Sequence, residues 1–536
     1  MLVLTSLAIL ALLVGPLPAG AAAVVGGVEG FTLAPRLAAE AWTFPAGRGD
    51  PSVVRSIRPF SLVPPAPCRS PFGVKETKPS AAYPARAPAW ILPGIVGEPA
   101  AAPGDEEQAV RKRPWLAGAE VFGSNMILWV YSRYIAKEDW AYISWESIKA
   151  NFRNGFEYDN DNFLTNFFMH PYHGSFYYSA ARSLNMSFLE SSLYTLGGSL
   201  MWEMLLENQY PSTNDLITTV AGGVYFGEVF YRMSSLLLDG AASGKRRTWR
   251  EILAFLINPM RGLNRLAFGE AGRTGDIDRQ PTAPLEGHLA LTGNYVISPG
   301  ESFGTGAGTA LEFDFLYGER FKGAGARAPF DFVLFDSRVR MAGRRAYPDI
   351  DSLALIWGRE RNNGKGRGHL IGLFQHFDYL DNELISIGGT SLAVGAVSFF
   401  PLGGGGKFEL RTSAQLGVSL ISAADNIYYP EASSEYHYGM GPMAKFEAHL
   451  AHERWGWLCL RFGHLRHYAI QGVNSADRVS YDFFSVLKAQ YGMSVRRGVG
   501  FRIEYASYFR RNHFEGTERT ATSLSHLGLS LILSFS

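Results

Sequence analysis

The 536-residue sequence has only two cysteines and almost no net charge, and these shortages exclude several classes of protein. Cys68 and Cys459 stand far apart and match neither a zinc-ligand spacing nor a disulfide framework, which argues against cysteine-based metal or redox chemistry. The 50 basic residues are balanced by 49 acidic ones, so the chain has no broad basic field. Because nucleic-acid binding depends on such a field, no nucleic-acid partner is expected.

The chain also lacks an uninterrupted apolar run of the roughly 20 residues that a membrane-spanning helix needs. Residues 1–23 combine a short apolar core, a proline break and the small residues around Gly20, a pattern typical of a cleaved export signal. A retained membrane anchor is the alternative. Residues 24–113 are rich in proline and alanine without an apolar period, which predicts a disordered linker.

Residues 114–266 differ from the linker and predict a helical domain. Ser187 and Glu190 have the S-x-x-E spacing of a capping box at the start of an apolar helix. Gly223 and Gly227 are spaced G-x-x-x-G, which would let a neighbouring backbone approach closely. Charged residues interrupt the apolar helices, so we expect these helices to pack together and not to span a membrane singly.

Residues 287–536, which follow a second linker at 267–286, alternate apolar and polar residues with the period of a β-strand. In FRIEYASYFR, for example, Ile503 falls on one face and Glu504 on the other. Turn signals divide this segment into about twelve strands with alternating long and short connections, as in bacterial outer-membrane barrels. The predicted fold class is an α+β membrane protein, with an N-terminal helical domain followed by a roughly 12-stranded antiparallel transmembrane β-barrel.

This fold predicts a location in the outer membrane of a Gram-negative bacterium. The last strand carries alternating apolar residues up to Phe535, similar to the signal that barrel-assembly machinery reads. We therefore expect outer-membrane lipids and that machinery as partners, and no particular oligomeric state. Both ends of the barrel segment should face the periplasm, which predicts a helical domain on the periplasmic side or in the barrel lumen, as a brace or a plug.

The helical domain also concentrates polar residues that suggest a site. The stretch NFFMHPYHGSFYYSAARS sets two histidines and an arginine among tyrosines, and acidic residues follow on the neighbouring helices. The candidate residues of this polar seam or ligand site are His170, His173, Tyr177, Arg182, Glu203, Glu207, Asp215, Glu228 and Arg232.

A structural seam is the favoured interpretation of these residues. Glu228 and Arg232 have the i,i+4 spacing of an ion pair, and tyrosine hydroxyls can satisfy buried charges. A lipid or ligand site, and a metal or acid–base centre, are the alternatives. However, His170 and His173 lack the i,i+4 spacing of a helical zinc motif, and Pro171 is expected to break the helix between them. We predict no cofactor and no metal, and assign no catalytic residue.

Three segments together carry a resemblance to a known family: DNDNFLTNFFMHPYHGSFYYSAARS, SLMWEMLLENQYPSTNDLITTVAGGVYFGEVFYRMSSLLLD and INPMRGLNRL. In combination they resemble the bacterial family called domain of unknown function 3943, over about residues 142–265. The resemblance implies an uncharacterised envelope-associated protein. It brings no established activity and no catalytic residue.

The sequence therefore predicts an outer-membrane barrel protein with a structural or transport-related role in the envelope. Charges of both signs on the inner face of the strands are expected to pair across the lumen and fill it, which disfavours a free diffusion pore. The competing hypothesis is an enzyme that modifies envelope lipids, of hydrolase or acyl-transfer type, and uses the region of His170 and His173.

Overall fold

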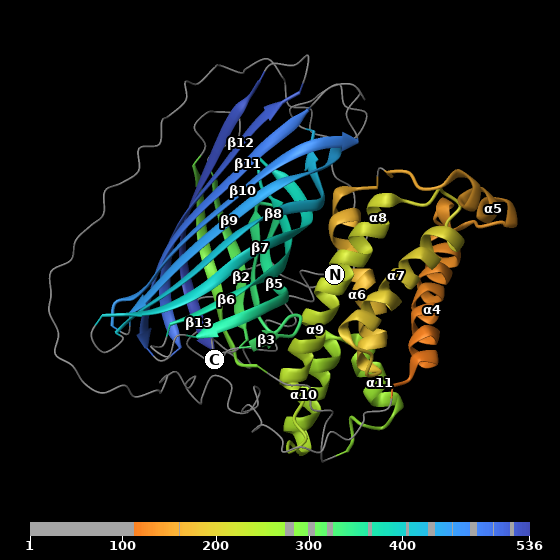
Figure 1. Ribbon diagram of the computed structural model, residues 1–536, viewed down its shortest axis with the longest axis horizontal. Coiled ribbons are helices and arrows are strands. Elements are labelled where there is room, and N and C mark those ends of the chain that lie inside the picture. The colour runs from red at the N-terminus through yellow and green to blue at the C-terminus, as the bar shows by residue number, and fades with distance from the viewer. Residues whose placement is uncertain are drawn as a thin grey trace. The chain divides into compact units, whose positions relative to one another are not determined.

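The computed structural model describes residues 112–159, 161–273, 283–297, 306–318, 325–362, 367–403, 407–426, 435–452, 454–471, 480–496, 498–514 and 519–535. The predicted export signal at 1–23 and nearly all of the predicted linker at 24–113 lie outside these residues. The described chain forms a group of helices, called here the helical block, and then a closed sheet (Figure 1).

The α-helices of the helical block are α4 (Pro114–Val130), α5 (Trp145–Asn154), α6 (His170–Ser183), α7 (Phe188–Leu205), α8 (Thr213–Ile217), α9 (Gly223–Leu237), α10 (Gly244–Ile257) and α11 (Pro259–Ala267). They are joined by π-helical turns at η1 (Tyr131–Ala136), η3 (Thr165–Met169) and η4 (Thr218–Gly222), and by the 3₁₀ turn η2 (Asp139–Ala141). In the part of the chain that the structure describes, no helix combines the length and the apolar character needed to cross a membrane.

Local sequence signals explain where these helices begin. The predicted capping box of α7 is confirmed, because the Ser187 hydroxyl accepts from the Glu190 N–H and the Glu190 carboxylate accepts from the Ser187 N–H. The predicted break at Pro171 is wrong, since η3 leads directly into α6 and Pro171 stands in its first turn. Proline has no backbone N–H, so at this position it leaves no donor without a partner. The wider π turn before it accommodates its ring.

Small residues let α6 and α9 approach closely, as the G-x-x-x-G spacing predicts. A Cβ atom added at Gly223 would lie 2.6 Å from the Cα atom of Gly174 on α6. One added at Gly227 would lie 2.6 Å from the Cβ atom of Tyr178. Side chains larger than hydrogen would therefore force these two helices apart.

The sheet consists of β1 (Leu285–Ile297), β2 (Gly306–Tyr317), β3 (Gly325–Arg327), β4 (Val333–Ala342), β5 (Arg345–Asn362), β6 (Gly368–Asp381), β7 (Ser386–Leu402), β8 (Phe408–Asp425), β9 (Tyr436–His452), β10 (Gly456–Gln471), β11 (Tyr481–Arg496), β12 (Val499–His513) and β13 (Ala521–Phe535). Of these 13 strands, β3 pairs only with β5. The others form an antiparallel ring that β13 closes against β1.

The alternation of side chains sorts the two faces of this ring. On β12, Ile503 is 59% exposed on the outer face, whereas Arg502 and Glu504 are 1% exposed and face the lumen. The same sorting recurs on the other long strands, whose outer faces are apolar and whose inner faces carry charges. The predicted fold class is confirmed: a helical domain precedes a closed 12-stranded antiparallel β-barrel.

The helical block packs against the outer face of the barrel wall. Phe377 and Tyr379 of β6 point outward, like the exposed Ile371 on the same strand, because residues two apart share a face. The ring of Phe226 on α9 lies 4.6 Å from that of Phe377. Asp378, between the two aromatic residues, faces the lumen and binds Lys445 there. The helices thus touch side chains that face outward, whereas the sequence predicted a plug in the lumen or a brace on the periplasmic side.

Candidate functional site

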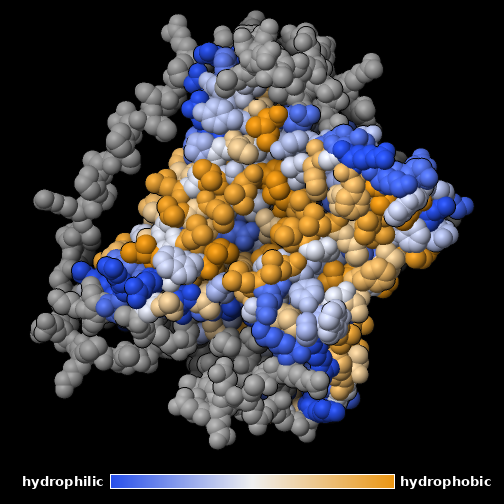
Figure 2. Space-filling model, turned by 45° about the vertical axis from the view of Figure 1, so that its right-hand side comes forward, coloured by the Kyte–Doolittle hydropathy of each residue, from blue (hydrophilic) through white to orange (hydrophobic). Residues whose placement is uncertain are grey.

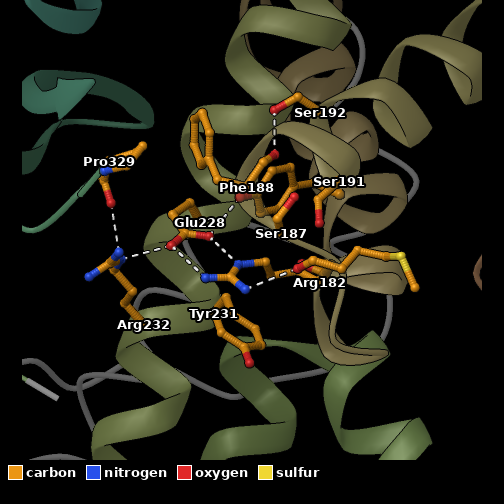
Figure 3. Close-up of polar contacts among 12 residues, drawn as sticks. Arg182, Ser187, Phe188, Ser191, Ser192, Glu228, Tyr231, Arg232 and Pro329 are labelled. Carbon is orange, nitrogen blue, oxygen red and sulfur yellow. Dashed lines mark hydrogen bonds and ion pairs between the residues drawn. The ribbon is translucent and has the colours of Figure 1, made fainter. Parts of the chain in front are cut away.

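Glu228 on α9 lies at the centre of a buried group of ion pairs, called here the arginine centre (Figure 3). Its carboxylate accepts hydrogen bonds from Arg182 Nε at 2.9 Å, Arg232 Nε at 2.8 Å and the Tyr178 hydroxyl at 2.7 Å. Burial alone would raise the pKa of Glu228, but the two guanidinium groups outweigh it and hold the pKa below its ordinary value. Glu228 is therefore a carboxylate at neutral pH.

The arginine centre also ties the helices to the barrel. Arg232 donates from Nη2 to the carbonyl oxygen of Pro329 at 2.6 Å and from Nη1 to Asp331 at 3.1 Å, both in the segment that leads into β4. Arg182 also packs on an aromatic residue of α9, since its guanidinium lies 4.8 Å from the centre of the Tyr231 ring. One buried carboxylate thus holds two arginines, and one of these binds the barrel.

A second polar group, called here the acid–histidine centre, forms where η3 and α8 meet the barrel. One oxygen of Asp159 accepts from Asn166 at 2.9 Å, Asn214 at 2.7 Å and the Tyr438 hydroxyl at 3.2 Å. Asp215 is hydrogen-bonded to Asp159. Burial and the neighbouring Asp159 raise the pKa of Asp215 well above its ordinary value, so Asp215 carries the proton that the two share.

The two histidines lie beside this pair and are neutral. His170 Nε2 is 3.5 Å from Asp215, and His173 Nδ1 is 3.4 Å from the Tyr177 hydroxyl. Burial lowers the pKa of His170 to about 4 and that of His173 to about 3. Tyr177 in turn donates to the side-chain oxygen of the buried Asn125 on α4. Neither imidazole supplies positive charge to the acidic groups at neutral pH.

Glu203 and Glu207 complete the acid–histidine centre. Glu203 accepts from the N–H of Ser212 at 2.8 Å, and Glu207 accepts from the indole of Trp202 at 2.5 Å. Burial raises the pKa of Glu207 to about 8, and that of Glu203 is also raised. Glu203 therefore helps to position the start of α8, and both groups favour the protonated form in this environment.

The structure divides the nine predicted residues between two centres. Arg182, Glu228 and Arg232 form the arginine centre, whereas His170, His173, Tyr177, Glu203, Glu207 and Asp215 belong to the acid–histidine centre. Among the residues that the structure describes, no group of three or more potential metal ligands is found. The candidate residues predicted from the sequence did not include Asp159, Asn166, Asn214 and Tyr438. The signals were the polar stretch DNDNFLTN, which contains Asp159 and Asn166, and the shared strand face of Tyr436 and Tyr438 in YHYGM.

The lumen of the barrel holds a further concentration of charge. Lys488 on β11 binds Asp349 on β5 at 2.8 Å, and Arg338 on β4 binds Glu504 on β12 at 2.5 Å. Since β11 and β5 stand opposite each other in the ring, the first pair crosses the lumen. Beside these pairs lies a cavity whose acidic and basic lining residues are Asp349, Asp351, Asp378, Lys445, Glu447, Arg461 and Lys488.

Apart from Tyr438 and Asn125, the residues of both centres fall in one stretch of the sequence, between Asp159 and Arg232. Residues 155–260 match the family model described as domain of unknown function, DUF3943. This match confirms the family resemblance that the sequence predicted. No curated protein matches the chain.

Solved structures similar to this chain are outer-membrane proteins that align with the barrel. OprD from Pseudomonas aeruginosa is 10% identical, with 47% of this chain and 94% of that chain covered and a TM-score of 0.19. The NanC porin is 10% identical, with 45% and 98% covered and a TM-score of 0.25. OccK2 (OpdF) from Pseudomonas aeruginosa is 8% identical, with 48% and 99% covered and a TM-score of 0.18. TM-scores this low give no support to a shared function.

The DUF3943 segment supplies most of the contacts between the helices and the barrel. Asn166 in this segment donates to the hydroxyls of Tyr436 at 2.7 Å and Tyr438 at 2.6 Å. The carbonyl oxygen of Ala221 in η4 accepts from Gln375 of β6 at 2.8 Å. Together with the Arg232 contacts, these bonds attach the DUF3943 segment at several points along the wall.

Proposed function

We propose that this protein is an outer-membrane β-barrel of the bacterial envelope in which the DUF3943 segment braces the barrel wall. The observation that carries this proposal is the sorting of side chains in the closed ring, apolar outside and ion-paired inside. Outer-membrane barrels have an apolar band toward lipid and a polar interior. A soluble β-sandwich would instead bury its apolar faces in one core.

The role we propose is structural or transport-related, with a lumen that does not conduct freely. The ion pair of Lys488 and Asp349 crosses the lumen, and neighbouring pairs surround the cavity beside it. Breaking a buried ion pair by removing one partner is costly, so the pairs favour a closed state. A polar solute would have to separate these pairs in order to pass.

Cell fractionation, gel mobility and planar-bilayer recordings test the proposal. We expect the protein in the outer-membrane fraction, and we expect it to migrate faster on a gel when it is unheated, as folded barrels do. In planar bilayers the wild-type protein should show no steady open-pore conductance. Recovery as a soluble periplasmic protein would overturn the membrane location, and a steady large conductance would overturn the closed lumen.

The alternative of an envelope-lipid-modifying enzyme has no comparable observation in its favour. His170 and His173 are held inside the helical block by protein contacts, and burial keeps them neutral. Purified protein in detergent, assayed against phospholipid and lipopolysaccharide with metals added or chelated, should show no turnover. Turnover that disappears in His170→Ala and persists in the exposed control Glu146→Gln would favour the enzyme instead.

A further inference from the structure

We propose that the helical block lies in the membrane beside the barrel, with the exposed faces of α4 and α7 in contact with lipid acyl chains. This inference rests on the proposed function, because it needs the barrel to be embedded in a membrane. It replaces the position on the periplasmic side or in the barrel lumen that the sequence predicted for the helical domain. The occupant it assigns to this apolar face is lipid, and not a second protein.

The first observation is how far the block extends along the barrel wall. At one end, Arg232 contacts the hydroxyl of Tyr317, the last residue of β2, at 3.4 Å. At the other end, Asn166 binds Tyr436, the first residue of β9. The pairing of the strands puts the end of β2 and the start of β9 at opposite edges of the sheet. The block therefore runs along the height of wall that would face lipid.

The second observation is that, beyond Glu190 in the first turn of α7, the exposed faces of α4 and α7 carry no charge. On α7, Leu189 is 72% exposed and Leu193 is 66% exposed, while on α4 Ile127 is 74% exposed. The one charged residue of α4, Glu120, is turned toward α11, where Asn264 donates to it at 3.0 Å. Glu203 of α7 is buried. A water-facing helix usually shows the opposite arrangement, with charged residues on its exposed face.

The third observation is that charged and polar groups mark both ends of this apolar face. At the N-terminal ends of α4 and α7, Lys112 pairs with Glu190 at 2.9 Å. At the C-terminal ends, Asn208 donates to the carbonyl oxygen of Asp139 at 2.7 Å, so the two helices run parallel. α4 has 17 residues and α7 has 18. At ~1.5 Å per residue such helices are about 27 Å long, close to the ~25 Å apolar band of outer-membrane barrels.

Exposed aromatic residues gather at the C-terminal end of α4, next to the charged Arg133 and Lys137. Such residues are enriched where a membrane meets water, because their rings are apolar and their polar groups reach the headgroups. The exposed aromatic residues here are Tyr131, Tyr134, Tyr142 and Trp145.

The fourth observation is that the apolar surface continues onto the barrel. Ile371 on β6, Val394 on β7 and Leu416 on β8 are 51%, 65% and 67% exposed on the outer wall, and these strands also carry contacts to the helical block. Figure 2 shows apolar residues across the middle of this side of the molecule, with hydrophilic residues above and below them. An embedded barrel needs lipid against these outer residues, and the same lipid layer would meet α4 and α7.

Spin-label accessibility in lipid vesicles tests this inference. In the full chain, with Cys68 and Cys459 replaced by serine, a nitroxide is attached to a single cysteine at Leu193 of α7. The barrel control is a label at Ile503, and the aqueous control is a label at Glu146 of α5. We expect the Leu193 and Ile503 labels to collide more with oxygen than with a water-soluble nickel complex, and the Glu146 label to show the reverse. Labels at Leu189 repeat the measurement if the first variant fails to fold.

The outcomes separate this inference from the proposed function. A Leu193 label that collides mainly with nickel, beside an Ile503 label that collides mainly with oxygen, would overturn the embedded block and leave the barrel in its membrane. An Ile503 label that collides mainly with nickel would overturn the proposed function itself. A Leu193 label protected from both reagents would show that a second copy or another protein covers α7, which also overturns the inference.

Discussion

Arg461 on β10 forms an ion pair with Asp336 on β4, although these two strands stand opposite each other in the ring of the barrel. Arg461 also donates to Glu447 at 2.9 Å, and Glu447 accepts from Arg411 at 2.8 Å. The bond to Asp336 therefore joins the two walls through the middle of the lumen. Mixed-sign charges on the inner face were expected to pair in this way, and the structure shows which residues do so.

Removing these cross-lumen cations should open the barrel to ions. In the double variant Arg461→Gln and Lys488→Gln, Asp336 and Asp349 lose their partners from the opposite wall. We expect steady conductance in planar bilayers where the wild type has none, with a preference for cations. The matched control is Arg345→Gln, whose pair with Asp381 at 3.6 Å lies in a half-exposed position. If the double variant folds, as faster migration of the unheated protein on a gel would show, but conducts no ions, these pairs are not what closes the lumen.

The closing strand offers a test of assembly. Leu533 and Phe535 face outward on β13, which pairs with β1 from Gly287 onward. Aspartate at both positions would put charge on the lipid side, at up to about 1 kcal/mol per site near the interface, and would remove the apolar alternation that barrel-assembly machinery reads. We expect the double variant to be degraded without reaching the outer membrane, as measured by fractionation and gel mobility. Leu533→Val with Phe535→Tyr serves as the control and should assemble normally.

Glu228→Gln should destabilise the helical block strongly. The amide keeps the shape of the side chain but removes the anion that Arg182 and Arg232 share, although Arg232 keeps its pair with Asp331. Loss of one partner from a buried ion pair costs about 3–5 kcal/mol. Chemical unfolding of the full chain in detergent, followed by helix content, should show this loss, whereas the exposed control Glu146→Gln should change little. An unchanged midpoint for Glu228→Gln would show that the carboxylate is not needed to hold the arginines.

Glu207 should make the stability of the helical block depend on pH. Burial raises its pKa to about 8 in the folded protein from 4.5 in the reference state, so the folded form keeps a proton that the unfolded form has released. Stability should therefore fall as the pH rises through this interval. Up to about pH 7.5 the two histidines oppose this trend, because their reference forms, with a pKa of 6.5, are partly protonated there whereas their folded forms are neutral. The Trp202 hydrogen bond to Glu207 lets indole fluorescence follow the change.

The variant Glu207→Gln provides the control for this pH dependence. It cannot ionise, so its stability should fall less between pH 6.5 and 8 than that of the wild type. Asp215 and Glu203 also have raised pKa values and leave a residual slope of the same sign. Equal slopes in the two proteins would show that Glu207 is not the group that titrates.

The barrel was predictable from the sequence because each strand carries its own two-residue period. Ile503 and Glu504 reveal opposite faces without any knowledge of their neighbours, and the same holds for the other long strands. Local sequence signals also predicted where helices begin, as the capping box of Ser187 and Glu190 shows. Pro171 was misjudged, because the π turn that precedes it depends on how the helix packs and not on the proline alone.

The candidate site was predictable in part. Glu228 and Arg232 are four residues apart on one helix, so their pairing follows from helical geometry. The third member, Arg182, reaches Glu228 only because α6 and α9 approach through their glycines. Asp159 and Tyr438 are separated by most of the chain, and no local pattern links a carboxylate before one helix to a hydroxyl on a strand. The position of the helices against the outer wall depends on such distant contacts, which is why the sequence predicted a plug in the lumen or a brace on the periplasmic side instead.

The π turn η4 also sets a numerical constraint on the chain. A π turn contains one residue more than the α-helical turn it replaces, so deleting one residue from Thr218–Gly222 would restore a regular helix. Every later residue of α9 would then turn by about 100° around the helix axis relative to α8. Gly227 would leave the ring of Tyr178, and Glu228 would leave the two arginines. Deleting even one residue from η4 would therefore break these contacts, although it would make the helix more regular.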